Sequence, residues 1–261
     1  MCYFCSVKKI TDIVQPIAAE LAQFEVFFEK TLRADTEPMD GIMHYVGDVR
    51  GKRLRPILVL LSAKLFGEVN EQTLRAATFV EMIHSATLLH DDVVDDADER
   101  RGRCSVKAQF GNLSAVLAGD YLLAKAMLLI SQLDDHDIMQ EMLSTTAAMS
   151  EGELMQNQNH SNYLDIITRK TALLMRSCCV AGGLSVNATP EQVQQIADFG
   201  LNFGILFQLR DDLLDGEHVE QANLLIPVYY EKSLQALEQL HASEATKALR
   251  DLTVFCAKRE F

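Results

Sequence analysis

The chain has 261 residues, of which 48% are hydrophobic, and its formal net charge is −13. This negative charge disfavours nucleic acid and anionic membrane surfaces as partners, because both need a basic surface on the protein. An anionic ligand would therefore need metal cations to help it bind.

Helix-forming residues are frequent, only five prolines occur, and no segment shows the sustained alternation of a strand. We expect a single all-α domain over residues 1–261 with buried central helices. The apolar run at 56–66 is too short to cross a membrane, and the first residues lack the apolar region of a secretory signal. We therefore expect no transmembrane segment and a cytoplasmic location.

The first motif along the chain is GKRLRP at 51–56, directly before an apolar segment. It places Lys52, Arg53 and Arg55 beside an expected helix start. Basic side chains and the helix dipole together favour an anion at such a position. The same residues also suit an ordinary solvated basic turn.

An expected helix from about 72 to 96 carries one polar stripe, in which His84, Thr87, Asp91 and Asp95 recur at steps of three or four residues. Its two aspartates stand one turn apart, about 6 Å along the axis. Because unpaired buried carboxylates are costly, we expect the stripe to face a cavity. Mg²⁺ fits there, since it takes one or two carboxylates and keeps its other positions for water and phosphate oxygens. A solvated acidic helix end is the alternative, as are ion pairs with Arg100, Arg101 and Arg103.

The segment FQLRDDLLD at 207–215 repeats the DDxxD spacing on a second apolar helix, with Asp211, Asp212 and Asp215. Two such clusters can face each other across a bundle. Opposed carboxylates repel unless divalent cations lie between them, so the pair predicts a multinuclear Mg²⁺ site. A diphosphate would supply bridging oxygens, which lets an acidic protein bind an acidic substrate.

With these motifs in order, the sequence resembles the trans-isoprenyl diphosphate synthases. The resemblance runs from Gly51 to Asp215, through GKRLRP, EMIHSATLLHDDVVDDADERRG, FGNLSAVLAGDYLLA, EGELMQ, RKTALL and GILFQLRDDLLD. It implies an isoprenoid synthase bundle with a central cavity. It also implies head-to-tail condensation, in which an allylic diphosphate ionises and the double bond of isopentenyl diphosphate attacks the cation. The product is an allylic diphosphate one isoprene unit longer.

The resemblance assigns roles by position. Metal binding on the allylic diphosphate falls to Asp91, Asp95 and Asp211. The other acidic members of the two clusters, which we include among the catalytic residues, are Asp92, Asp212 and Asp215. Isopentenyl diphosphate would be bound by Lys52, Arg55, His84 and Arg101. The allylic diphosphate would be bound by Arg100 and Lys170, while oxygens of Thr171 and Gln208 would face the reacting carbons.

The resemblance also implies a cofactor, an oligomeric state and a product. Mg²⁺ is the expected cofactor, with three ions once substrate is bound and Mn²⁺ able to substitute. The segment FGNLSAVLAGDYLLAKAMLLI matches the region through which family members form homodimers, and a core helix of a monomer is the alternative. Ala86 and Thr87 stand on the cavity side before Asp91, and their small size implies a medium- or long-chain product of six or more isoprene units. Such a lipid would leave at a membrane surface, to which the enzyme would be peripheral.

At two places the chain lacks segments that family members have. One lies near 157–162, and the other lies near 216–223, where the family's glycine-lysine loop and following helices are absent. We interpret both as segments omitted from a longer chain, because loops near a diphosphate site are commonly mobile. A true deletion is the alternative, and intact mass would decide between the two.

Other functions fit part of this sequence. A short-chain farnesyl or geranylgeranyl diphosphate synthase would share the motifs. A class I terpene cyclase would share the first aspartate cluster, but it usually lacks the second and does not need GKRLRP. A non-catalytic subunit of a heteromeric prenyl synthase would have lost aspartates, whereas both clusters are complete here. A helical scaffold with calcium-binding acids would leave the basic motif unexplained.

Overall fold

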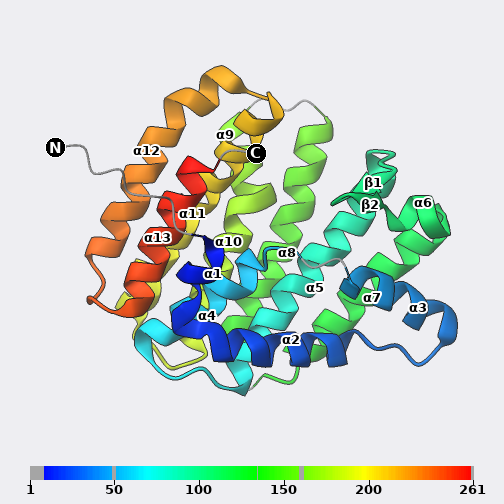
Figure 1. The fold of residues 1–261 in the computed structure, drawn as a ribbon, viewed down its shortest axis with the longest axis horizontal. Helices are drawn as coiled ribbons and strands as arrows, with labels where there is room; N and C mark the ends of the chain where they lie inside the picture. Colours follow the sequence, from blue (N-terminus) through cyan, green and yellow to red (C-terminus); the bar gives the residue numbers. More distant parts are fainter. Residues whose placement is uncertain (1–8, 49–50, 134, 159–161, 260–261) are drawn as a thin grey trace.

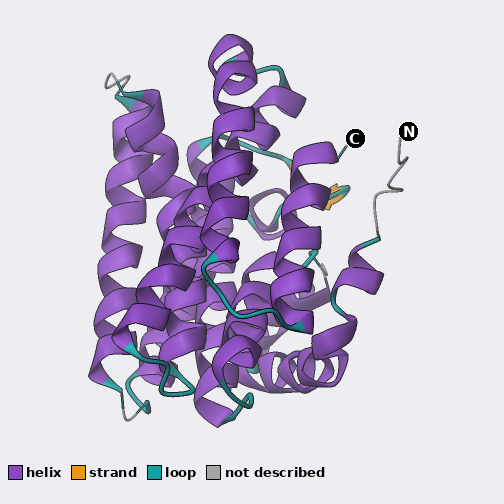
Figure 2. Cartoon of the chain, turned by 90° about the vertical axis from the view of Figure 1, so that its left-hand side faces the viewer, coloured by secondary structure: helices purple, strands orange, loops and turns teal. Residues whose placement is uncertain are grey.

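The computed structural model describes residues 9–48, 51–133, 135–158 and 162–259, and it confirms the all-α prediction (Figure 2). Its first half contains α1 (Ile10–Ile13), η1 (Gln15–Ile17), α2 (Ala18–Leu32), α3 (Glu37–Asp48), α4 (Leu54–Phe66), α5 (Glu71–Val94), β1 (Glu99–Arg100), β2 (Arg103–Cys104), α6 (Val106–Phe110) and α7 (Asn112–Ile130). Its second half contains α8 (His136–Asn157), α9 (Tyr163–Ile167), η2 (Thr168–Ala172), α10 (Leu173–Leu184), α11 (Pro190–Asp215), α12 (Val219–Glu238) and α13 (Glu244–Lys258). The two short strands form a hairpin in which Arg100 pairs with Arg103.

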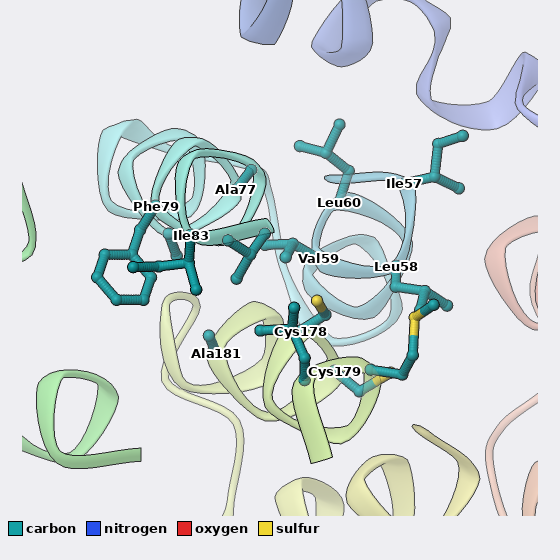
Figure 3. Close-up of a cluster of buried hydrophobic side chains, with 14 of the residues drawn as sticks. Ile57, Leu58, Val59, Leu60, Ala77, Phe79, Ile83, Cys178, Cys179 and Ala181 are labelled. Carbon is teal, nitrogen blue, oxygen red and sulfur yellow. The ribbon is translucent and has the colours of Figure 1, made fainter. Parts of the chain in front are cut away.

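The core forms around α10, which packs against α4, α5, α8 and α11 (Figure 1). Figure 3 shows its centre, where α4, α5 and α10 contribute Ile57, Leu58, Val59, Leu60, Ala77, Phe79, Ile83, Cys178, Cys179 and Ala181. α4 is apolar on nearly every side, which is the pattern of a buried helix. A β-carbon on Gly182 would lie 2.3 Å from the carbonyl oxygen of Val59, so only glycine permits this approach of α10 to α4.

Capping fixes the registers of α5 and α11, the two helices that carry the aspartate clusters. Asn70 and Thr73 form a reciprocal capping box at the start of α5, and Thr189 and Gln192 form another at the start of α11. Both clusters lie at the C-terminal ends of these helices. The helix dipole disfavours negative charge there, which adds to the need for cations.

α7 packs along α5 (Figure 1). Several of its apolar residues are exposed. Leu113, Leu117 and Leu128 are 74%, 50% and 64% exposed, and their spacing places them on one stripe. By length and composition α7 could cross a membrane, with a mean hydropathy of 1.7. A helix packed against a protein core or another subunit meets the same criterion.

Of the two places where we expect segments to be omitted, the structure describes one in part and the other in full. Residues 159–161, inside the first stretch, lie outside the described residues. The second stretch consists of a turn at 216–218 and the beginning of α12. Gly216 and His218 both have positive φ, at 77° and 44°, which allows α12 to reverse direction directly after α11.

Candidate active site

A cleft of about 1220 Å³ lies between α5, α8, α11, α13, η2 and the start of α4. It brings together most of the residues singled out in the sequence. Those on its wall are Lys52, Arg55, His84, Thr87, Asp91, Asp95, Arg100, Arg101, Lys170, Thr171, Gln208, Asp211 and Asp215. Asp92, Asp212 and Ala86 are not on this wall, and each is buried.

The acidic side of the cleft carries negative charge that the protein only partly balances. Burial raises the pKa of Asp91 to about 6, with repulsion from Glu153 as the next cause and Lys170 opposing it. Burial also raises the pKa of Asp211, against the opposite effect of Arg259. A divalent cation would relieve both carboxylates, so the donor set fits Mg²⁺.

Within the described parts of the chain, no three His, Cys, Asp or Glu side chains form a group that could hold a metal ion. Each aspartate cluster can therefore provide only part of a coordination shell. Mg²⁺ commonly takes one or two carboxylates and completes its shell with water and phosphate oxygens. This geometry suits ions that arrive with a phosphorylated ligand.

The second aspartate of each DDxxD cluster is engaged inside the protein. Asp92 is 2% exposed and accepts hydrogen bonds from Arg100, with a Nε–Oδ1 distance of 2.8 Å. Asp212 accepts from the hydroxyl of Tyr163 at 2.5 Å and from the side-chain amide of Gln208 at 2.7 Å. Both residues thus hold neighbouring groups in place and do not face the cleft directly.

The basic side of the cleft combines Lys52, Arg55, His84 and Arg101. Burial lowers the pKa of Arg55 and that of Arg101. The pKa of His84 is lowered well below its usual value by burial and by both arginines, so the ring is neutral at pH 7. The buried Nε of Arg55 has no hydrogen-bond partner among the described residues. An anion here would balance the charges and supply that missing acceptor.

The middle residue of the basic motif behaves differently from its neighbours. Arg53 has φ 52° and is only 8% exposed. Its guanidinium pairs with Glu81 at 2.8 Å and Glu25 at 2.9 Å, and it lies 4.7 Å from the centre of the Phe28 ring. Arg53 therefore joins α2, α4 and α5, and although it lies on the cleft wall with Lys52 and Arg55, its guanidinium is already paired with two carboxylates.

A π-helical turn, η2 (Thr168–Ala172), presents Lys170 and Thr171 to the cleft. Such turns often occur at functional sites. Lys170 pairs with Glu153 at 2.6 Å, and the Thr171 hydroxyl donates to the side-chain oxygen of Gln208 at 2.7 Å. The motif RKTALL identified both residues, but the sequence contained no signal for the π-turn itself.

Three further residues were not predicted. Glu153 lies within EGELMQ and holds Lys170. Arg259 ion-pairs with Asp211, and its guanidinium lies 4.4 Å from the centre of the Phe207 ring. Tyr163 bonds to Asp212. None of the three follows a stripe shared with an aspartate cluster, so spacing could not identify them.

Among the two residues expected to control product length, only Thr87 lies on the wall of the cleft. Ala86 is fully buried behind it. Apolar residues of α5 and α8 also line the cleft, namely Leu88, Met149 and Leu154. A hydrocarbon chain that passes along this side would therefore meet Thr87 before Ala86.

An all-α bundle whose cleft combines two aspartate clusters with a basic wall is chemically suited to a metal-bound phosphorylated ligand. The profile of the polyprenyl synthetase family matches residues 36–223. The chain belongs to this family.

Similar proteins agree with this assignment. Octaprenyl diphosphate synthase of Haemophilus influenzae is 38% identical over 191 residues, which are 70% of this chain and 58% of that protein. A decaprenyl diphosphate synthase structure from Rhodobacter capsulatus has a TM-score of 0.90 at 26% identity and covers 97% of this chain and 100% of that one. A polyprenyl synthase structure from Caulobacter crescentus, complexed with calcium and isoprenyl diphosphate, has a TM-score of 0.88 at 25% identity. The match covers 97% of this chain and 99% of that one. The chain thus spans less than two thirds of the octaprenyl synthase it matches.

Proposed function

We propose that the chain is a head-to-tail prenyltransferase that condenses an allylic diphosphate with isopentenyl diphosphate to give a polyprenyl diphosphate. One observation carries the proposal: Asp91 and Asp211, from two aspartate clusters, and the basic residues Arg55 and Arg101 line the same cleft. The acidic clusters suit a metal-bound diphosphate and the basic wall suits a diphosphate without metal. A reaction that joins two diphosphate esters needs both.

Isopentenyl diphosphate would occupy the basic wall. Lys52, Arg55 and Arg101 would bind its phosphate oxygens, and neutral His84 would donate one hydrogen bond. The partnerless Nε of Arg55 supports this assignment, because a buried donor without an acceptor is costly. Holding the homoallylic double bond close to the reacting carbon would convert a bimolecular step into an effectively unimolecular one.

The allylic diphosphate would occupy the acidic side. Asp91, Asp95 and Asp211 would hold Mg²⁺, which when bound neutralises the charge that develops on the leaving diphosphate. Lys170 and Arg100 already lie at this side, paired with Glu153 and Asp92. Their charges would stabilise the leaving diphosphate further. The calcium and isoprenyl diphosphate named for the Caulobacter crescentus structure support this occupancy.

The developing allylic cation would face Thr171 and Gln208, both of which line the cleft. Their oxygens stabilise positive charge without forming a covalent bond. We assign the final proton to the released diphosphate, since Thr171 and Gln208, which would face the cation, are not basic.

We propose a medium- or long-chain product, because Thr87 leaves the wall open below the first cluster and the relatives include octaprenyl and decaprenyl synthases. A short-chain synthase is the alternative. A class I cyclase is disfavoured by the complete second cluster and the basic wall.

We also propose that the chain forms a homodimer through the exposed stripe of α7. Apolar residues such as Leu113, Leu117 and Leu128 suit contact with a second copy. Leu117→Arg would place a charge in that contact, so sedimentation should show dimers for the wild type and monomers for the variant. Wild-type protein that sediments only as a monomer at micromolar concentration would contradict the proposal. A cytoplasmic location, with release of the product at a membrane, belongs to the same proposal.

Diphosphate release tests the proposed reaction. Geranyl or farnesyl diphosphate would be supplied with Mg²⁺, with and without isopentenyl diphosphate. Release that requires both substrates supports the synthase. Release from the allylic substrate alone would instead support a cyclase.

A further inference from the structure

A chain of three hydrogen bonds connects residues inside the protein to the cleft. The Tyr163 hydroxyl donates to Asp212 Oδ2 at 2.5 Å, and Gln208 Nε2 donates to Asp212 Oδ1 at 2.7 Å. The Thr171 hydroxyl then donates to Gln208 Oε1 at 2.7 Å. Thr171 and Gln208 line the cleft, whereas Tyr163 and Asp212 do not. These three hydrogen bonds thus join α9, α11 and η2.

Asp212 determines the direction of these bonds. Each carboxylate oxygen of Asp212 accepts a hydrogen bond, so the Gln208 amide turns its NH₂ group toward Asp212. The amide oxygen then lies on the Thr171 side, where it accepts the only hydroxyl hydrogen of Thr171. The remaining lone pairs of both oxygens are therefore available to the cleft. Oxygen dipoles favour a developing cation, whereas an N–H group in the same place would oppose it.

Tyr163 holds in place the carboxylate of Asp212, which orients the Gln208 amide. Its hydroxyl bonds the second oxygen of buried Asp212, and such charge-assisted bonds are short and strong. The Tyr163 ring is itself held, because it packs on the His218 ring with centroids 4.3 Å apart. We propose that Tyr163 is a positioning residue that acts through Asp212 to keep the oxygens of Gln208 and Thr171 toward the reacting carbons. This inference rests on the proposed function.

The affinities of two ligands would show whether a change at Tyr163 alters the positions of the two oxygens or the structure of the protein in general. The first is an allylic thiolodiphosphate, which cannot ionise readily and reports ground-state binding. The second is an ammonium analogue that mimics the allylic cation, supplied with inorganic diphosphate. Calorimetry with Mg²⁺ would measure both. Tyr163→Phe should weaken the ammonium analogue about tenfold, the scale of one ordinary hydrogen bond, and leave thiolodiphosphate affinity unchanged. The kcat should fall by a similar factor while both KM values stay constant.

The matched control is Tyr121→Phe, which removes a hydroxyl that donates to the Arg33 carbonyl at 3.2 Å, outside the cleft. It should behave as wild type in every measurement. A second variant, Asp212→Asn, keeps the size of the side chain but allows the Gln208 amide to turn around. It should weaken the ammonium analogue more than Tyr163→Phe does. Thermal melting would establish that each variant is folded.

The outcomes distinguish this inference from the proposed function. If wild-type protein does not condense the two substrates, the proposed function is wrong. If wild type condenses them but Tyr163→Phe binds the ammonium analogue as tightly as wild type does, only the inference is overturned. Equal weakening of both ligands would also overturn it, because that pattern marks a general structural effect. Should Tyr163→Phe not fold, Asp212→Asn decides by the same two affinities.

Discussion

Gly152 of α8 lies directly against the backbone of Lys170 in the π-turn. A β-carbon on Gly152 would stand 2.8 Å from the Lys170 nitrogen and 2.8 Å from the Arg169 β-carbon. In the same way, a β-carbon on Gly204 of α11 would stand 2.6 Å from the Ala172 α-carbon. The turn that presents Lys170 is therefore clamped between two helices that can approach only through glycine.

Gly152→Ala should displace this turn. Movement of a catalytic group by about 1 Å can cost about a hundredfold in rate, so we expect a loss of kcat on that scale. The overpacking should also lower the free energy of unfolding by about 1–3 kcal/mol. The control is Gly41→Ala in α3, where a β-carbon would meet nothing within 4 Å. It should retain kcat in steady-state assays, and full activity of Gly152→Ala would contradict the clamp.

Substitutions at two adjacent residues of the basic motif should have different effects, one on the free energy of unfolding and the other on substrate binding. Arg53→Ala would leave Glu81 and Glu25 without their guanidinium partner, so it should lower the free energy of unfolding by about 3 kcal/mol. Lys52→Ala should leave denaturant unfolding unchanged and raise the KM for isopentenyl diphosphate. Arg53→Ala with wild-type stability would show that we have misassigned the motif.

Metal dependence should follow the first aspartate cluster. Asp91→Asn should lower kcat at least about a hundredfold, because the charge on the leaving diphosphate would be less neutralised. A chelator should abolish wild-type turnover, and Mg²⁺ should restore it. The control is Asp96→Asn, since Asp96 is exposed and pairs with Lys107 at 2.5 Å. A normal rate for Asp91→Asn would exclude it as a metal ligand.

Product length should respond to Thr87. Thr87→Phe would place an aromatic ring on the wall of the cleft, and such a ring cannot share a close-packed tunnel with a prenyl tail. The product should become shorter, as measured by chromatography after dephosphorylation. Ala86→Phe would overpack the buried core behind that wall and should mainly reduce stability. An unchanged product from a folded Thr87→Phe variant would remove this residue from length control.

Spacing predicted the helical fold and the two aspartate clusters on the cleft wall, whereas Lys170, Thr171 and Gln208 were predicted from the family resemblance. Asp91 and Asp95 are four residues apart, so they lie on the same face of a helix wherever that helix begins. A second cluster with the same spacing on another helix implies that the two clusters face each other. Local sequence could not separate Arg53 from Arg55, since the left-handed backbone at Arg53 turns its side chain toward α2 and α5. Contacts that cross the bundle, such as Arg259 with Asp211, have no periodicity to reveal them.

The central claim is that one cleft joins two diphosphate substrates. The most direct test incubates the wild-type protein with farnesyl diphosphate, labelled isopentenyl diphosphate and Mg²⁺, then identifies the dephosphorylated products by chromatography. We expect polyprenols of six or more isoprene units, and no labelled product when the allylic substrate or Mg²⁺ is omitted. A folded protein that transfers no label into longer polyprenols, or releases diphosphate equally without isopentenyl diphosphate, would contradict the account.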